Sequence, residues 1–272
     1  MASHGLDFTR IRHLLNPDLL ADKRVVQVGM GSGGAPVNQH LTMAGVRKWI
    51  LFDPEIYDPI NLVKHPGLRS QIGQPKVTMQ HEWIIDRNPE AEVMTYQEDV
   101  IHNTRFISEC NNASLVLCCV DTPGAREFVN KICVERGVPC VTGAVFRTGF
   151  GGDVYAYIPE KTGCYACMEY YCSIKGYTYS ETEPELTEEE KERIYGQDDR
   201  NFQASGLSLD IAFITLIHAR LALNILLDGQ QTAIPQIKHN WMVFENRPLP
   251  GFKKYFTLPP QEECPIQCRS KK

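Results

Sequence analysis

The amino-acid sequence predicts an α/β protein whose core is a doubly wound, mostly parallel sheet. Two observations lead to this fold class. Between residues 24 and 142, short apolar runs typical of buried strands alternate with stretches of helical spacing, and this succession produces parallel βαβ units. The first of these strands also runs directly into a glycine-rich turn and then a helix, which is typical of the Rossmann-like variety of such sheets.

The expected elements follow one another along the chain. We predict strands at residues 24–29, 49–53, 92–96, 114–120 and 139–142, separated by helices at 33–44, 75–88 and 123–136. The helix at 75–88 begins with a proline, which suits the first helical turn, and stops before Pro89. After residue 143 we expect added antiparallel strands at 153–158, 241–245 and 254–258, and an apolar helix at 207–227.

Length and composition restrict the class of protein. The chain has 272 residues and a net charge of -5, which suits one large domain and does not favour nucleic-acid binding. We expect neither a secretory signal in the polar residues 1–12 nor a membrane span at 207–227, a stretch interrupted by Asp210, His218, Arg220 and Asn224. Ten cysteines without such a signal indicate a reducing compartment, so we expect a cytoplasmic protein.

A glycine pattern marks the turn after the first strand. Gly29, Gly31 and Gly34 match GxGxxG, and glycines here let a phosphate approach the positive N-terminus of the following helix. Asp53 follows 19 residues after Gly34, at the end of the second strand, where a carboxylate can accept hydrogen bonds from a ribose. We therefore expect a nucleotide site. The pattern alone fits NAD as well as ATP, and a glycine turn that binds nothing is the alternative.

A series of polar and charged residues follows Asp53. It comprises Glu55, Asn61, Lys64, Arg69 and Lys76. Nicotinamide chemistry needs no row of cations beside the phosphates, whereas cleavage of a triphosphate does, because negative charge builds on the departing pyrophosphate. Asp121 follows the strand at 114–120, and a carboxylate at that edge of the sheet is a natural magnesium ligand. The alternative is that these residues are ordinary solvated surface charges, which is the simpler interpretation of any one lysine taken alone.

Four cysteines form two pairs far apart in the sequence. Two residues separate Cys164 from Cys167, and three separate Cys264 from Cys268. Four thiolates suit a closed tetrahedral zinc site in which one turn supplies two ligands. Metal binding worth about 10 kcal/mol or more offsets the roughly 4 kcal/mol of chain entropy that such a long loop costs. We predict a zinc knuckle; two unconnected pairs of free thiols are the alternative.

Taken in order, these motifs resemble those of the ubiquitin-activating superfamily, which includes the ThiF and MoeB adenylyltransferases and the minimal activating enzyme for the modifier UFM. The resemblance covers residues 24–268 and is carried by Gly29-x-Gly31-x-x-Gly34, Asp53, Asn61-Leu-Val-Lys64-His65, Ile72-Gly-Gln-Pro-Lys76, Cys118-Cys-Val-Asp121 and Cys164-x-x-Cys167. It implies that residues 1–272 form one adenylation domain. Its parts would be a nucleotide-binding core at 23–143, extra strands with the zinc knuckle at 144–172 and 239–268, and a crossover loop at 173–205.

The resemblance also implies a function. Members adenylate the C-terminal glycine carboxylate of a ubiquitin-like or sulfur-carrier protein with ATP and magnesium, and some go on to a thioester. By that resemblance Asp53 would hold the ribose, Asn61, Lys64 and Lys76 would face the phosphates, and Asp121 would bind magnesium. A homodimer and a conjugating enzyme are further implied partners. The acidic stretch 181–200 would cross the path of the modifier's tail, although a solvated charged loop explains its composition equally well.

Some positions depart from the family. Lys64 and His65 stand where relatives usually have Arg and Gln, and a lysine lacks the planar fork with which arginine grips phosphate. Relatives that form a thioester carry a cysteine in the loop after the first zinc pair, so Cys172 is the candidate nucleophile, with a spare ligand or an inert thiol as alternatives. Arg10 and Arg12 are the candidates for the N-terminal arginine that many relatives insert into the partner subunit.

Two other function classes compete with adenylation. A nicotinamide-dependent dehydrogenase would explain the glycine pattern and Asp53, but would leave Lys64, Lys76 and Asp121 without a joint purpose. A catalytically inactive scaffold subunit would keep the fold and the dimer surface, but has no need of Asp53, Lys76 and Asp121. A relative that dehydrates modified tRNA fits neither the acidic balance nor the cysteine pairs.

Overall fold

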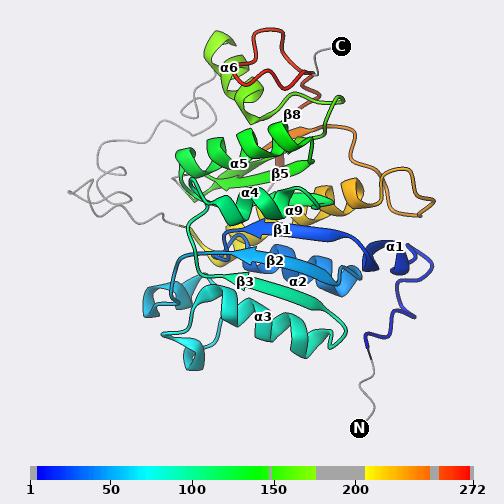
Figure 1. Cartoon of the computed structure of the whole chain (residues 1–272), viewed down its shortest axis with the longest axis vertical. Coiled ribbons are helices and arrows are strands. Elements are labelled where there is room, and N and C mark those ends of the chain that lie inside the picture. Colours follow the sequence, from blue (N-terminus) through cyan, green and yellow to red (C-terminus); the bar gives the residue numbers. More distant parts are fainter. Residues whose placement is uncertain (1–4, 147–148, 176–205, 246–250, 270–272) are drawn as a thin grey trace.

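A single eight-stranded sheet runs through the structure. The computed structural model describes residues 5–146, 149–175, 206–245 and 251–269 (Figure 1). The strand order is β3-β2-β1-β4-β5-β6-β7-β8. The strands are β1 (Arg24–Val28), β2 (Lys48–Phe52), β3 (Glu92–Tyr96), β4 (Leu115–Cys118), β5 (Cys140–Val145), β6 (Gly151–Tyr157), β7 (Trp241–Glu245) and β8 (Gly251–Phe256). Pairing is parallel from β3 to β5 and antiparallel from β5 to β8, which confirms the predicted fold class.

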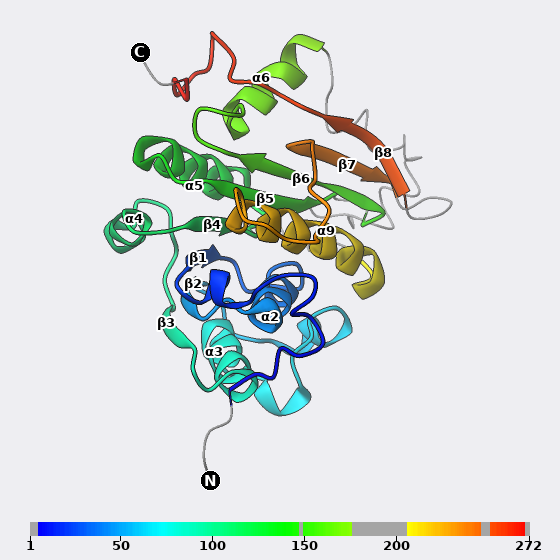
Figure 2. The ribbon, with the colours of Figure 1, turned by 90° about the vertical axis from the view of Figure 1, so that its right-hand side faces the viewer.

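Helices cover both faces of the sheet (Figure 2). On one face α2 (Ala35–Ala44), α3 (Lys76–Arg87) and α9 (Ser208–Leu226) pack against alternate strand residues such as Val25 and Leu117. On the other face α4 (Thr104–Cys110), α5 (Pro123–Arg136) and α6 (Tyr165–Lys175) pack against residues such as Val26 and Val116. Both faces are thus buried, as continuous apolar strands require. A short α1 (Asp18–Ala21) precedes β1.

Most predicted elements occur within a few residues of their predicted bounds. We did not predict the helices α1, α4 and α6. Cys172 consequently lies in the helix α6 and not in a loop, and residues 173–175, expected to begin the crossover loop, are helical as well. The acidic stretch 181–200 lies outside the described residues.

The apolar helix α9 is a core helix of this protein. It is long and apolar enough to cross a membrane, yet 61% of its most apolar window is buried inside the protein. Asp210, His218 and Asn224, which argued against a span, are all buried within the protein. The Asn224 side chain accepts a hydrogen bond from Ile237 N at 2.9 Å and donates one to Pro235 O, so its polar atoms are paired.

Candidate functional site

The glycine loop, residues 29–34, joins β1 to the N-terminus of α2. Its glycines fall into two kinds. Gly29 has φ 89°, and a Cβ there would lie 2.6 Å from Cys119 O, while one at Gly34 would overlap Gly29 O. These two glycines are therefore needed for the loop to pack on the protein itself. A Cβ at Gly31 or Gly33 would meet nothing within 4 Å, so this side of the loop is open to a ligand.

Polar side chains brace the loop from behind. Gln27, fully buried on β1, donates to Gly34 O at 2.8 Å and to Gly29 O at 3.2 Å. The Thr215 hydroxyl of α9 lies 3.2 Å from Gly33 O and 3.0 Å from Ile211 O of its own helix, so the two carbonyls share its single proton. In the described part of the chain no group accepts from the backbone amides of residues 31–33. A fixed loop with unpaired amides at a helix N-terminus is suited to bind phosphate.

Asp53 lies directly after β2 and is buried against the glycine loop. One carboxylate oxygen accepts from Met30 N and the other from Glu55 N at 2.8 Å. Burial raises the pKa of Asp53, and these two backbone hydrogen bonds and the charge of Lys76 oppose the rise. The structure thus places this carboxylate beside the loop, as expected for a group that holds a ribose.

The predicted phosphate-facing residues lie on the excursion between β2 and α3. Asn61 belongs to a 3-10 helix, η1 (Pro59–Val63), and its side-chain oxygen accepts from Asp58 N at 3.0 Å. That oxygen therefore caps the turn. Lys64 follows directly at the end of η1.

Lys76 is the first residue of α3, and only 5% of its surface is exposed. Its ammonium group pairs with the Glu55 carboxylate. The charge of Lys76 acts on both Asp53 and His65. The structure therefore brings a buried cation, the Asp53 carboxylate and the glycine loop together, which is the arrangement that stabilises charge on a phosphate.

Asp121 lies just beyond β4 and is exposed. It follows Cys119 and Val120, the two residues whose backbone approaches Gly29, and precedes the first turn of α5. A single exposed carboxylate at this edge of the sheet, beside the glycine loop, suits magnesium, which takes one or two protein carboxylates and fills its remaining positions with phosphate and water.

The two cysteine pairs meet in one buried cluster. All four sulfur atoms lie within 4.8 Å of one another. Cys164 Sγ is 4.0 Å from Cys167 Sγ and 3.6 Å from Cys264 Sγ, and Cys167 Sγ is 3.3 Å from Cys268 Sγ. Zinc–sulfur bonds of about 2.3 Å at tetrahedral angles put sulfurs about 3.8 Å apart. Gln261 N also donates to Cys167 Sγ at 3.4 Å, so this donor set fits zinc.

Cys172 is neither in this cluster nor activated as a thiolate. It is half-buried, and its Sγ lies 3.8 Å from Met168 Sδ. Burial, together with the charges of Asp153 and Glu169, raises its pKa to about 11. In this arrangement Cys172 is a protonated thiol at neutral pH, so the nucleophile role stays a prediction that needs a change of environment.

Arg10 and Arg12 are exposed, but not near the glycine loop of their own chain. Their segment contacts residues that follow α2 and α9, through Pro17 against Gly45 and a hydrogen bond from Ala233 N to Leu14 O. The loop lies at the other end of α2. Any contact of these arginines with a glycine loop would thus involve another chain.

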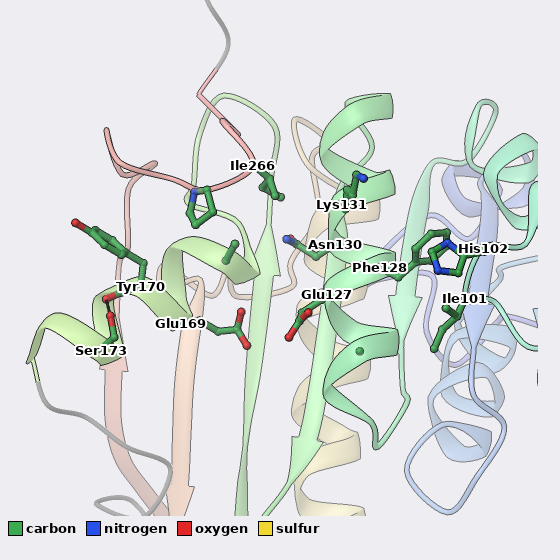
Figure 3. Close-up of a pocket in the computed structure, with 13 residues that line it drawn as sticks. Ile101, His102, Glu127, Phe128, Asn130, Lys131, Glu169, Tyr170, Ser173 and Ile266 are labelled. Carbon is green, nitrogen blue, oxygen red and sulfur yellow. Dashed lines mark hydrogen bonds between the residues drawn. The ribbon is translucent and has the colours of Figure 1, made fainter.

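A separate cavity of about 750 Å³ lies between α5 and α6 (Figure 3). The carboxylates of Glu127 and Glu169 face each other across it, with Asn130 and Ile266 beyond them. None of the predicted site residues lines it. The residues predicted to bind the nucleotide lie instead at and beyond the ends of β1, β2 and β4.

Gln27, Thr215 and His65 support the loop but were not predicted to do so. The signal available for the first two was a polar residue inside an apolar run, at 24–28 and at 207–227. The only signal for His65 was that it stands where relatives usually have Gln. Its actual partner, Met30 O, is 35 residues earlier in the chain, a pairing that no local pattern reports.

Comparisons with known proteins agree with this geometry. The model of the ThiF family matches residues 7–265. Ubiquitin-like modifier-activating enzyme 5 of Caenorhabditis briggsae is 30% identical over 159 residues, which are 55% of this chain and 37% of that protein. The sulfur carrier protein ThiS adenylyltransferase of Escherichia coli is 27% identical over 151 residues, 55% of this chain and 59% of that protein. The chain thus matches less than two thirds of either relative's length.

A solved structure shows the same fold. E. coli MccB, crystallised with ATP, covers 92% of this chain with a TM-score of 0.71 and 17% sequence identity, and the match spans 68% of that chain. At this identity the likeness concerns the arrangement of the elements alone.

Proposed function

The chain belongs to the ThiF family, and on that premise we propose that it transfers AMP from ATP to the C-terminal carboxylate of a ubiquitin-like or sulfur-carrier protein. The names of its relatives support this reaction, since they are adenylyltransferases or modifier-activating enzymes. The observation that carries the proposal is the open face of the loop at Gly31 and Gly33, together with the buried Lys76, whose charge acts on the Asp53 carboxylate that holds the loop at Met30 N.

The site residues have separate tasks in this reaction. An oxygen of the partner's carboxylate attacks the α-phosphorus of ATP, the bond to pyrophosphate breaks, and the acyl-adenylate forms. The carboxylate is already ionised, so no general base is needed, and positioning and charge neutralisation supply the rate. The loop amides and Lys76 would balance the charge on the departing phosphates, with Asn61 and Lys64 nearby, while Asp53 holds the ribose. Asp121 would hold magnesium, which neutralises the same charge.

The cysteine cluster has a structural role in this proposal. Zinc held by Cys164, Cys167, Cys264 and Cys268 would fix α6 to the C-terminal segment. A site with four protein thiolates leaves no position for a substrate. The cluster thus stabilises the fold without taking part in the adenylation.

A later thioester step is the finer part of the proposal. The acyl-adenylate would pass its acyl group to a thiolate and release AMP. Cys172 would be that nucleophile, and a conjugating enzyme would then accept the product. A partner adduct that resists denaturation, is cleaved by added thiol and is lost in Cys172→Ala would support this step; an adduct that persists in Cys172→Ala would exclude Cys172.

Pyrophosphate exchange tests the adenylation itself. The purified protein is mixed with radiolabelled pyrophosphate, ATP, magnesium and, one at a time, candidate small β-grasp proteins that end in glycine. We expect label in ATP only when a β-grasp protein is present, and about 100-fold less with Lys76→Met. Binding of NAD in place of ATP would favour the dehydrogenase. ATP binding without exchange with any such partner would favour an inactive scaffold.

A further inference from the structure

His65 is a buried side chain with two defined hydrogen bonds. Only 6% of its surface is exposed. Its Nε2 lies 2.8 Å from Met30 O, and Gly67 N lies 2.9 Å from its Nδ1. A carbonyl oxygen only accepts and a backbone N–H only donates. The ring is therefore neutral, with its proton on Nε2, and both nitrogen atoms are paired.

The bond to Met30 acts on the centre of the glycine loop. Met30 lies between Gly29 and Gly31, and its own N–H donates to the Asp53 carboxylate. Asp53 thus fixes the amide of Met30, and His65 fixes its carbonyl. With two polar groups held, the peptide planes on either side of Met30 cannot rotate freely. This is the stretch whose orientation sets the direction of the open amides at 31–33.

The other side of His65 is anchored to the protein. The Tyr57 ring packs against the imidazole with centroids 4.9 Å apart, and the Tyr57 hydroxyl donates to Gly67 O at 3.0 Å. A Cβ at Gly67 would collide with Met79, so the turn that carries Gly67 lies tightly against α3. His65 is therefore a strut between a fixed turn and the glycine loop.

We infer that His65 is a positioning residue that holds the glycine loop in its nucleotide-binding shape, an inference that rests on the proposed ATP site. The strut works only with a neutral ring, because protonation would put an N–H at Nδ1 facing the N–H of Gly67. Burial lowers the pKa of His65 and the charge of Lys76 lowers it further, although the bond to Met30 opposes this. Tyr57 and Lys76 are the titratable groups that face the ring.

Two substitutions separate the hydrogen bonds from the volume of the ring. His65→Gln keeps one N–H donor and one acceptor, whereas His65→Phe fills the space and offers neither. At pH 8 we expect His65→Phe to weaken ATP binding by about 10-fold, and His65→Gln to restore it to within about 3-fold of the unaltered protein. His239→Phe is the matched control, since it makes the same substitution at a partly buried histidine just before β7 and should change the affinity by less than about 2-fold.

The pH dependence gives a second readout. As the pH falls below the ordinary histidine value of about 6.5, the unaltered protein should lose ATP affinity as the ring gains a proton. His65→Gln should not share this loss. The phosphates of ATP also titrate in this range, so the difference between the two proteins is the quantity to compare. Identical pH profiles would overturn the inference.

A third readout does not involve nucleotide. Without ATP, hydrogen exchange of the Met30 amide should be about 10-fold faster in His65→Phe than in the unaltered protein, and nearly unchanged in His65→Gln. Unchanged exchange in His65→Phe would overturn the positioning role even if ATP binds. Conversely, altered exchange in a protein that binds no ATP would leave the strut in place and refute the proposed function.

Discussion

At the scale of single residues, the glycine loop separates positions that serve the fold from positions that serve the ligand. Gly29 and Gly34 lie against Cys119 and against each other, whereas Gly31 and Gly33 face open space. The same chemical change should therefore have opposite effects at neighbouring positions.

We predict that Gly34→Ala destabilises the protein by about 2 kcal/mol or more, because the added methyl group overlaps Gly29 O. Gly31→Ala should leave the free energy of unfolding within about 0.5 kcal/mol and weaken ATP binding at least about 10-fold. Urea unfolding and calorimetric titration with ATP check both. Gly124→Ala is the control, since a Cβ at this exposed glycine of α5 also meets nothing within 4 Å. Equal ATP affinities for Gly31→Ala and Gly124→Ala would refute the assignment.

The sequence could identify the loop but not its supports. The glycine spacing and Asp53 are local signals, and the structure brings both together as expected. The Lys76–Glu55 pair spans 21 residues, and Thr215 reaches Gly33 from 182 residues away. Such pairings depend on how the elements pack, so the periodicity and spacing of the sequence cannot predict them.

At the scale of elements, the sequence predicted those with a strong periodicity and missed short ones. The helix α5 and the strands β3 and β7 have their predicted bounds. In contrast, α4 has only seven residues and begins where the Asn103 side chain caps Arg105 N and Phe106 N. In α6 the cysteine pair and the aromatic residues obscured the helical spacing, so Cys172 was wrongly assigned to a loop.

The cysteine cluster ties α6 to the segment after β8, and its removal should affect stability first. We predict about one zinc per chain in the unaltered protein and well under half of that in Cys264→Ser, with a melting temperature lower by about 10 °C. ATP affinity should change by less than about 3-fold, because α6, which carries Cys167, lies apart from α2, which follows the glycine loop (Figure 2). Metal analysis and thermal melting measure these changes. Cys172→Ser is the control, because it removes a thiol that lies outside the cluster. A metal-free unaltered protein of equal stability would contradict the zinc site.

At the scale of the whole molecule, an apolar surface lies next to the nucleotide-binding features. Val63 is 79% exposed and Leu68 is 66% exposed, and Ile56 and Ile60 on the same excursion are exposed as well. Several large apolar side chains on one short segment are typical of an interaction surface. The segment also carries Lys64, so an interface here would adjoin the proposed phosphate site.

We predict that this surface forms the homodimer contact. Val63→Glu and Leu68→Glu together should raise the dimer dissociation constant by at least about 10-fold, because charges would be buried at the contact. Analytical ultracentrifugation measures this. Ile174→Glu is the control, an exposed apolar residue on α6. A monomeric unaltered protein at micromolar concentration, or dissociation by Ile174→Glu alone, would contradict the prediction.

The place of α9 in the chain affects how the protein emerges from the ribosome. The strands β1 to β5 and the glycine loop are all complete by residue 145, but α9, which packs against α2, β5 and β6, begins at Ser208. Until that helix has been synthesised, the strand residues it will cover, such as Val141, stay in contact with water. The nascent chain thus carries a bare apolar sheet through the synthesis of more than a fifth of the sequence, about 60 residues at roughly 5–20 residues per second. That interval is when binding of a chaperone would most improve the yield of folded protein.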